Sequence, residues 1–415
     1  MRKVKNLIIG GGITGLSTAS FLGDDDYLIL EKEDECGGYC KTTVRNGFVW
    51  DYSGHFFHFR NHEIREYVMA NMDCEVLEVR KITDIDYNGY IVDFPFQYNI
   101  DQLPKKDFIE CLSDLYNTKD ISNENFKEYV KSTSGDSIAN KFLIPYNEKL
   151  YATDLNQLDS DAMGRFFPKP MNFDQLMERL GNKSRYVSYN DNFIYPVNGS
   201  IEFVRSILKR LDPLKIQNNV TVEAIDLKNK VVKTTMGEIA FENLISSLPF
   251  NTFLKLCGTS TDAKLTSNKV AVFNLGFDKP TWIKTHWRYY PGKEIFYRVG
   301  FYNNILGADR MSLYVEIGAT TNQELDEHRL LNQVLLDLKD VGVIEDHKLV
   351  DHQFIVMNPA YVHITKESDQ AYKDWVIENE PNGIYSIGRY GSWTYCSIED
   401  NIIQARETAD KIRNK

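Results

Sequence analysis

The chain has 415 residues, a formal net charge of −11 at pH 7 and a pI near 5.3. This length exceeds what one hydrophobic core usually serves, so we expect two or three domains with room for a large cofactor between them. The acidic balance argues against nucleic-acid and anionic-membrane binding, because both depend on basic surface fields; any polyanionic ligand must be met by local arginines. No apolar run approaches a signal sequence or membrane span, and six scattered cysteines do not form a secreted disulfide framework. We therefore expect a cytoplasmic protein with free thiols.

The N-terminal segment predicts a dinucleotide site. An apolar strand at residues 7–9 runs into Gly10-Gly-Gly-Ile-Thr-Gly15, and an apolar-periodic helix follows. Glycines in this G-x-G-x-x-G turn let the backbone approach a pyrophosphate, whose charge then faces the helix N-terminus. A second strand, 27–30, ends in Glu31, at the spacing expected for a carboxylate that binds the ribose hydroxyls. The candidate cofactor contacts here are Gly10, Gly12, Ile13, Thr14, Gly15, Glu31 and Lys32.

A second glycine pair, Gly37-Gly38, suits another close approach of the backbone to the pyrophosphate, and we add Gly38 and Tyr39 to the cofactor contacts. Residues 48–59 are rich in aromatic side chains and contain Gly54 and His55. This composition fits a segment that passes along a flat ring, although a buried strand explains the same residue types. His55 has an ordinary pKa near neutrality and could donate or accept a hydrogen bond there.

Two other patterns in this region have competing interpretations. Cys36 and Cys40 flank the glycine pair, but their C-x-x-x-C spacing and the lack of a second nucleotide motif favour ordinary thiols over a redox disulfide. His55, His58 and His62 could suggest a metal site, yet the first two lie in a strand-like run, where residues three apart face opposite sides. We predict no metal.

The rest of the chain changes from helices to strands. Residues 102–180 have helical apolar spacing, and 192–210 predict a strand at 193–197 and a helix from Ile201 to Arg210 that Ser200 caps. Strands are expected at 221–225, 230–235 and 244–248, then at 270–277, 296–303 and 311–319 with a helix at 323–338. A strand at 383–388 precedes a helix at 398–412, where Ser397 and Asp400 match a capping box.

Together these elements predict an α/β fold: a Rossmann-like dinucleotide-binding domain with an inserted helical domain and an antiparallel β-sheet domain. The nucleotide-binding domain is expected to be discontinuous, over 1–57, 193–264 and 376–415. The helical substrate domain is expected over 100–192, and the sheet domain over 58–99 and 265–375. Because no second G-x-G-x-x-G occurs, one dinucleotide and one other substrate is the simplest interpretation.

At this point the residues resemble the UDP-galactopyranose mutases, flavoenzymes that interconvert nucleotide-activated pyranose and furanose sugars. Besides the opening glycines and Gly37-Gly38, the segments that carry the resemblance are Trp50-Asp-Tyr-Ser-Gly-His55, Pro145-Tyr-Asn-Glu-Lys149, Met163-Gly-Arg165, Tyr289 with Phe296-Tyr-Arg298, and Gly388-Arg-Tyr-Gly-Ser-Trp-Thr-Tyr395. The chain departs from the family where Ser397 stands in place of a frequent acid, and where a tyrosine-proline segment appears only as Ala360-Tyr361-Val-His363.

The resemblance implies roles for residues in these segments. The dinucleotide would be FAD, with Gly54, His55, Gly388, Arg389, Ser397 and Ile398 as further cofactor contacts. The implied substrate contacts are Asn147, Arg165, Tyr289, Arg298, Tyr361, Arg389 and Tyr395, and the implied catalytic residues are His55, Arg298 and Arg389. Guanidinium groups keep their charge and donate in forks that suit phosphate oxygens, so the three arginines are expected to converge on one diphosphate.

The family's chemistry implies that reduced FAD attacks the anomeric carbon of the sugar through N5, with no net redox change. The helix N-terminus at Ile398 would stabilise negative charge on the reduced ring, although its cap residues are those of any helix start. The implied partners are a nucleotide sugar, UDP-galactose or a close relative used for cell-surface polysaccharides, and an electron donor such as NAD(P)H. A homo-oligomer is also an expectation.

Two other functions fit parts of the pattern. The glycine motif also marks FAD-dependent oxidoreductases of the amine-oxidase and desaturase type, which would not need the arginines. A sensor that binds FAD and a nucleotide sugar would need the arginines for binding but would catalyse no reaction. The sugar, the base, the physiological reductant and any role of Cys36 and Cys40 stay open from the sequence.

Overall fold

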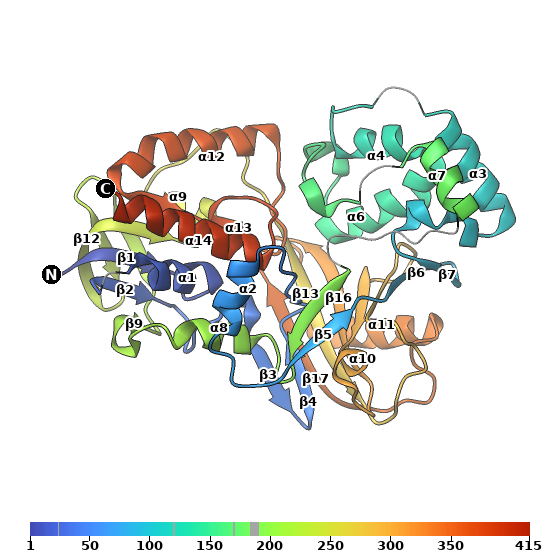
Figure 1. Ribbon diagram of the computed structural model, residues 1–415, viewed down its shortest axis with the longest axis horizontal. Coiled ribbons are helices and arrows are strands. Elements are labelled where there is room, and N and C mark those ends of the chain that lie inside the picture. Colours follow the sequence, from blue (N-terminus) through green and yellow to red (C-terminus); the bar gives the residue numbers. More distant parts are fainter. Residues whose placement is uncertain (24, 119–120, 169–170, 183–190) are drawn as a thin grey trace.

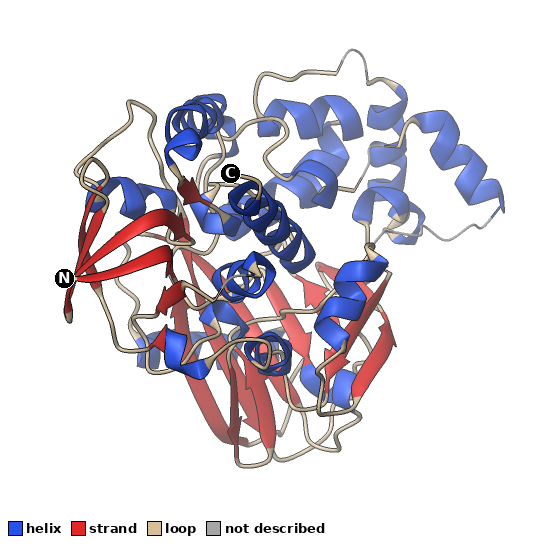
Figure 2. Ribbon diagram, turned by 60° about the vertical axis from the view of Figure 1, so that its left-hand side comes forward, coloured by secondary structure: helices blue, strands red, loops and turns tan. Residues whose placement is uncertain are grey.

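The structure is a computed structural model that describes residues 1–23, 25–118, 121–168, 171–182 and 191–415. Figure 1 shows both termini on one side, in a region where helices cover a sheet, and a group of helices on the opposite side. A mostly antiparallel sheet, in which one pair of strands is parallel, lies below and between them, and the second view separates its strands from the surrounding helices (Figure 2). The predicted α/β class with a Rossmann-like domain is confirmed.

A seven-stranded sheet carries the nucleotide-binding region. Its main path has the order β10-β11-β12-β1-β2-β9, and β18 pairs with β12. The strands are β1 (Arg2–Ile9), β2 (Tyr27–Leu30), β9 (Ile216–Gln217), β10 (Val222–Asp226), β11 (Val231–Thr234), β12 (Gly237–Ser246) and β18 (Ile384–Ser386). β1 pairs in parallel with β2 and β12, and its last residues, Leu7 to Ile9, are buried. This apolar run is typical of a parallel strand covered on both faces.

The helices of this region flank the sheet. They are α1 (Ile13–Leu22), α2 (His62–Met69), α8 (Ile201–Leu208), α9 (Phe250–Leu256), α12 (Lys366–Asn379), α13 (Gly388–Gly391) and α14 (Ile398–Arg413). Helices α1 and α14 pack side by side, so the first glycine turn and the last motif of the chain meet although nearly 400 residues separate them (Figure 1). The predicted capping box is confirmed: Ser397 accepts from the backbone of Asp400, and the Asp400 side chain accepts in return.

The helical region follows the prediction for residues 102–180. Its helices are α3 (Lys105–Tyr116), α4 (Phe126–Ser134), α5 (Asp136–Ile138), α6 (Ile144–Tyr151) and α7 (Phe173–Asn182). A π-helical turn at 139–143 connects α5 to α6, an arrangement that often occurs at functional sites. Residues 183–190 of the predicted helical domain lie outside the described residues.

The second seven-stranded sheet has the order β17-β13-β16-β15-β14-β6-β7. Its strands are β6 (Thr83–Tyr87), β7 (Tyr90–Asp93), β13 (Asn268–Phe277), β14 (Trp287–Tyr289), β15 (Arg298–Phe301), β16 (Ser312–Thr320) and β17 (Leu349–Met357). Two helices accompany it, α10 (Tyr302–Leu306) and α11 (Glu327–Asp340). Two small sheets pair β3 (Thr42–Arg45) with β4 (Phe48–Asp51), and β5 (Val76–Arg80) with β8 (Asn192–Pro196).

Three local predictions need correction. Ser200 does not cap α8 with its side chain; buried Asp51 accepts from the Ser200 amide at 3.0 Å, and Thr42 Oγ1 accepts from the Ile201 amide at 3.1 Å. The strand expected at 296–303 ends at Phe301, where α10 begins. The helix expected from 323 starts at Glu327, because the Asp326 side chain accepts from the backbone there and caps it.

None of the helices in the described part of the chain is both long and apolar enough to cross a membrane.

Candidate functional site

A cavity of about 1300 Å³ lies where the three regions meet. Twenty of the twenty-one site residues expected from the sequence lie on its wall. They are Gly10, Gly12, Ile13, Thr14, Glu31, Lys32, Gly38, Tyr39, Gly54, His55, Asn147, Arg165, Tyr289, Arg298, Tyr361, Gly388, Arg389, Tyr395, Ser397 and Ile398, with Gly15 the one left out. A Cβ on Gly15 would lie 2.0 Å from the Gly10 carbonyl oxygen, so this glycine lets α1 pack against the turn instead.

The two glycine turns form one end of the cavity. Gly10 has a φ of +103° and Gly38 a φ of +56°, conformations that side chains rarely adopt. The Gly37 amide donates to the Gly11 carbonyl at 2.9 Å, and a Cβ on Gly12 would lie 4.0 Å from the Gly38 Cα, so the two turns face each other closely. Bare backbone on both sides is the cradle that a pyrophosphate needs.

Glu31 lies at the end of β2 beside this cradle. Its Oε2 accepts from the Gly11 amide at 2.7 Å, and its Oε1 accepts from the Glu33 amide at 2.9 Å. The carboxylate is buried and held by two backbone donors, so its position is fixed before any ligand binds. The contact of this carboxylate with a ribose stays a prediction.

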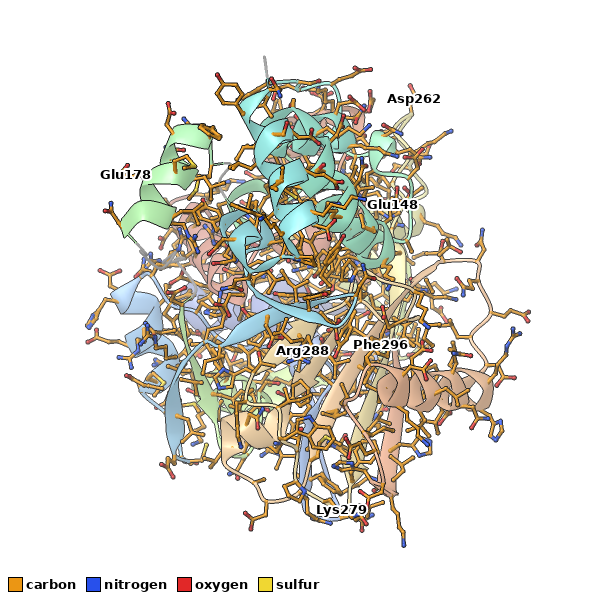
Figure 3. The ribbon with its side chains drawn as sticks, turned by 90° about the vertical axis from the view of Figure 1, so that its right-hand side faces the viewer. Glu148, Glu178, Asp262, Lys279, Arg288 and Phe296 are labelled. Atoms are coloured by element: carbon orange, nitrogen blue, oxygen red, sulfur yellow. The ribbon has the colours of Figure 1, made fainter. Side chains whose placement is uncertain are left out.

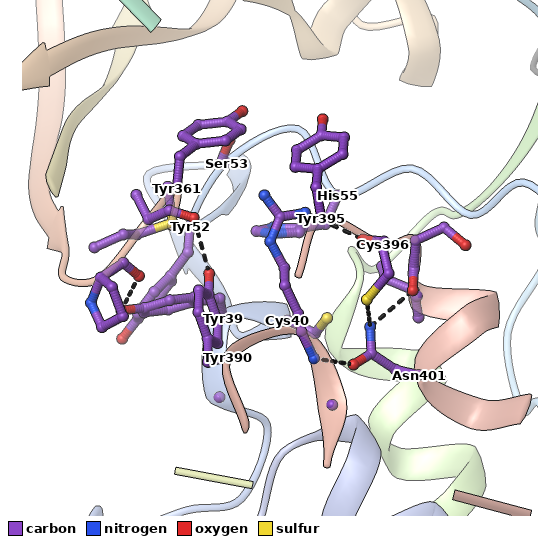
Figure 4. A pocket seen from close by; sticks show the side chains of 18 of the residues that line it. Tyr39, Cys40, Tyr52, Ser53, His55, Tyr361, Tyr390, Tyr395, Cys396 and Asn401 are labelled. Atoms are coloured by element: carbon purple, nitrogen blue, oxygen red, sulfur yellow. Dashed lines mark hydrogen bonds between the residues drawn. The ribbon is translucent and has the colours of Figure 1, made fainter. Parts of the chain in front are cut away.

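The C-terminal motif approaches the same cradle from α13 and α14. Asn401 Oδ1 accepts from the Arg389 amide at 2.7 Å and from Thr14 Oγ1 at 3.0 Å, which ties α14 to α1. A Cβ on Gly388 would lie 2.6 Å from Thr14 Oγ1, so only glycine allows this approach. Figure 4 shows Asn401 and Cys396 beside the start of α14, where Ser397 begins the helix.

The Gly-His loop lies against the antiparallel sheet. A Cβ on Gly54 would lie 2.5 Å from the Tyr314 hydroxyl, so the loop is seated closely on β16. His55 Nδ1 is buried and has no hydrogen-bond partner among the described residues. Burial, with a contribution from the Arg389 charge, lowers the pKa of His55 to about 4. The sequence expectation of a pKa near neutrality is wrong, and the imidazole is neutral at pH 7.

Arg298 and Glu316 form a buried ion pair on the wall. They are opposite each other on β15 and β16, and the Arg298 Nη2 lies 2.7 Å from Glu316 Oε1. The Glu316 side chain is 1% exposed and also accepts from Ser53 Oγ, one residue before Gly54. The carboxylate therefore joins the Arg298 guanidinium to the Gly-His loop.

The other two arginines differ in their partners. Arg389 has no carboxylate partner in the described part of the chain; its Nη1 donates to the Cys396 carbonyl at 3.2 Å, and its guanidinium lies 4.4 Å from the centre of the Tyr395 ring. Arg165 instead donates to Asp400 at 2.5 Å, in the first turn of α14. The structure brings all three arginines to one cavity wall, where Arg298 and Arg165 are each paired with a carboxylate.

Aromatic side chains line the end of the cavity away from the glycine turns. The Tyr361 and Tyr395 rings stack at 5.8 Å and lie near each other in Figure 4. On the side of the helical region, Tyr146 meets Tyr289 edge to face at 5.2 Å. Trp287 Nε1 donates to the Tyr289 hydroxyl at 2.8 Å and fixes its direction. These rings give flat apolar surfaces with polar tips, which suit a sugar or a base.

Some buried polar atoms of the wall residues lack hydrogen-bond partners within the described protein. Among the described residues, His55 Nδ1, both side-chain amide atoms of Gln97, and Asn147 Oδ1 have no hydrogen-bond partner, and all three residues belong to the cavity wall. Such atoms are destabilising unless a ligand or water satisfies them. With the glycine cradle, they fit a dinucleotide cofactor and a polar second ligand.

Comparisons with known proteins agree with this arrangement. The sequence profile of the NAD(P)-binding Rossmann-like domain matches residues 8–70. A crystal structure of reduced UDP-galactopyranose mutase superposes with a TM-score of 0.90 at 22% identity, over 98% of this chain and 95% of that one. The chain has the fold of UDP-galactopyranose mutase.

Other enzymes share this mutase fold to a lesser degree. A protein from Exiguobacterium sp. 255-15, named as a protoporphyrinogen oxidase, gives a TM-score of 0.79 at 18% identity, over 100% of this chain and 99% of that one. A fatty acid isomerase from P. acnes that produces CLA gives 0.67 at 14% identity, over 97% of each chain. The same fold therefore serves oxidases and isomerases, and the residues of the cavity must decide between them.

Several wall residues of this mutase-like fold were missed by the sequence reasoning. Glu316 had a signal, because it is a charge inside the otherwise apolar strand 312–320, where a carboxylate needs a buried partner. No sequence signal singled out Asn401 or Gln97, because amide side chains are common at helix starts and in loops. Cys396 lies beside Arg389, and burial raises its pKa to about 11, so it is a neutral thiol.

The six cysteines are free thiols. Burial is the main cause that raises the pKa of Cys36 to about 11 and that of Cys40 to about 12, so neither is a thiolate at neutral pH. Cys36 contacts the Asn218 side chain at 3.7 Å. This supports the interpretation of the pair as structural thiols. The described residues contain no group of three or more side chains that could hold a metal ion.

Proposed function

We propose that the chain is an FAD-dependent mutase that interconverts the pyranose and furanose forms of a nucleotide-activated sugar, UDP-galactose or a close relative. The observation that carries the proposal is one cavity that holds a dinucleotide cradle, the half-buried Gly-His loop, and the Arg298 and Arg389 guanidiniums. Redox chemistry on this scaffold requires the cradle but not two arginines near aromatic rings. Binding of a nucleoside diphosphate beside the cofactor would use the arginines as well.

The residues that would hold FAD fit the molecule. The two glycine turns would take the pyrophosphate, Glu31 the ribose, and the N-terminus of α14 would face the negative end of the reduced ring. When bound in reduced form, FAD would supply a nucleophile for the anomeric carbon, without net oxidation of the sugar. A reduced cofactor requires an electron donor, for which NAD(P)H is a candidate.

The chain's own part in the reaction is to hold and stabilise the diphosphate. Arg389 is not paired to a carboxylate in the described structure, so its charge is available to a leaving group that gains charge. Arg298 would hold a second guanidinium near the same leaving group, and Glu316 orients that guanidinium. His55 is neutral at pH 7 and can donate or accept a hydrogen bond without adding charge next to the two arginines.

The decisive experiment incubates the holoenzyme, reduced with dithionite, with UDP-galactofuranose and a panel of nucleotide sugars, and separates products by chromatography. We expect ring conversion by the reduced enzyme only. An Arg389→Met variant should lose at least about tenfold in kcat/KM per bound FAD, because a charge-assisted contact to phosphate is removed. Equal rates with oxidised enzyme, or full activity of the variant, would overturn the proposal.

The second candidate is an FAD-dependent oxidoreductase, favoured by the TM-score of 0.79 to the protein named as a protoporphyrinogen oxidase. It predicts net consumption of oxygen or another acceptor during turnover, with no dependence on Arg389. Measuring acceptor consumption in the same incubations separates the two functions. Saturable binding of nucleotide sugar without any turnover would indicate a sensor.

A further inference from the structure

Lys149 connects the helical region to the strand hairpin that carries two wall residues. It lies on α6, and its Nζ donates to the backbone carbonyls of Tyr290 at 3.1 Å and Phe296 at 3.2 Å. Its ammonium is also 3.7 Å from Glu294 Oε2, and its side chain is 22% exposed. Lys149 does not line the cavity. A mostly buried lysine with three oxygen neighbours is strongly held in place.

The Tyr290 and Phe296 carbonyls lie near the two ends of the loop between β14 and β15. At the start of that loop, the Tyr290 amide donates to the Tyr297 carbonyl at 2.9 Å, and Tyr289 pairs with Arg298 in the strand register. Lys149 therefore contacts both sides of the hairpin next to the two residues that face the cavity. Figure 3 labels Glu148, the residue before Lys149, above Phe296, which lies in the loop between β14 and β15.

The same helix supplies the opposite side of this part of the cavity. Tyr146 and Asn147 on α6 line the wall, and Tyr146 packs against Tyr289. The end of α6 is seated on β16 as well, because a Cβ on Gly318 would lie 1.9 Å from the Lys149 carbonyl oxygen. Lys149 thus fixes α6 to the hairpin at the point where their side chains face each other.

We propose that Lys149 is a positioning residue that sets the separation between Tyr146 and Asn147 on α6 and Tyr289 and Arg298 on the hairpin. The inference rests on the proposed function for its catalytic consequence. With Lys149 in place, the four side chains form one rigid end of the cavity. Without its hydrogen bonds, the hairpin can shift relative to α6, and small shifts of substrate contacts lower catalysis strongly.

The test compares Lys149→Met, which keeps the length and loses the donors, with Lys149→Arg, which keeps charge and donors. A matched control is Lys127→Met, because Lys127 pairs with Glu148 at 3.7 Å on the neighbouring surface and has no bond to the hairpin. For the holoenzymes we expect Lys149→Met to raise the KM for nucleotide sugar and the Kd for UDP about tenfold, with FAD content unchanged. Lys149→Arg should recover most of the loss, and the control should stay within about twofold.

A ligand-independent measurement separates this inference from the function itself. Hydrogen exchange of the amides at 288–298 should become faster in Lys149→Met and stay unchanged in Lys127→Met. Faster exchange in an enzyme that does not bind UDP would keep the positioning role and refute the mutase. Unchanged exchange together with an unchanged Kd, or equal effects of the two methionine variants, would overturn the inference. If Lys149→Met does not fold, the same comparison with Lys149→Gln decides it.

Discussion

Removing either partner of the Arg298–Glu316 pair should destabilise the protein strongly. The Glu316 side chain is 1% exposed and the Arg298 side chain 18% exposed, and two hydrogen bonds join them. Glu316→Gln leaves the guanidinium buried without its counter-charge, and Arg298→Met leaves the carboxylate in the same state. A broken buried pair costs about 3–5 kcal/mol, so each single variant should lose about that much unfolding free energy.

The double variant separates pairing from simple truncation. Because it leaves neither charge unpaired, it should lose less than the sum of the single variants, with a coupling free energy of about 3 kcal/mol or more. Urea unfolding at saturating FAD measures all four proteins. The exposed Lys279–Asp346 pair is the control, and its cycle should show no measurable coupling. If the buried cycle is as additive as this control, the carboxylate does not hold Arg298 and our account of the wall is wrong.

Two further predictions test the cofactor end and the pH dependence. Gly54→Ala should weaken FAD binding at least about tenfold, because the new Cβ would lie 2.5 Å from the Tyr314 hydroxyl. Flavin fluorescence titration measures the affinity, and Gly181→Ala is the control, because a Cβ there would have nothing within 4 Å. Equal FAD affinities of the two variants would contradict the prediction. Burial lowers the pKa of His286 to about 4, and its Nδ1 accepts from the Ile82 amide at 3.0 Å. Since the unfolded chain binds the proton first, the free energy of unfolding should fall as pH drops from 6.5 to 4, by about 3 kcal/mol from this residue. His286→Gln should show a smaller fall in urea midpoint over the same range, and an identical fall would count against this account.

The elements that the sequence predicted well are those set by local pattern. β2 spans the predicted residues 27–30, and α14 begins at Ile398 behind its capping box. In both cases, short-range features decide the structure: an apolar run of strand length, and paired cap residues. The cofactor end of the cavity was predictable for the same reason, because glycine turns are local.

The elements that were missed depend on distant partners. Helix α12 buries only Ser368 among its fourteen residues, so its apolar spacing is weak, and its capping box uses Thr365 with Ser368. The start of α8 is capped by Asp51, which lies 149 residues earlier in the chain. The pairing of Arg298 with Glu316 follows from the register of β15 and β16. Strand register and helix caps from distant residues depend on the packing of the whole chain, so no short segment of the sequence reveals them.

The different pairing of the arginines bears on how this acidic protein would hold the diphosphate that we propose as part of its ligand. Glu316 balances the charge of Arg298, and Asp400 balances that of Arg165, so both can be buried or ordered without a ligand. Arg389 is stabilised by tyrosine rings and a carbonyl instead, and these partners add no negative charge. A ligand with two phosphates would therefore meet a site that is already ordered and in which the positive charge of Arg389 is not compensated by a carboxylate. Such a local arrangement would let the site accept an anion despite the net charge of −11.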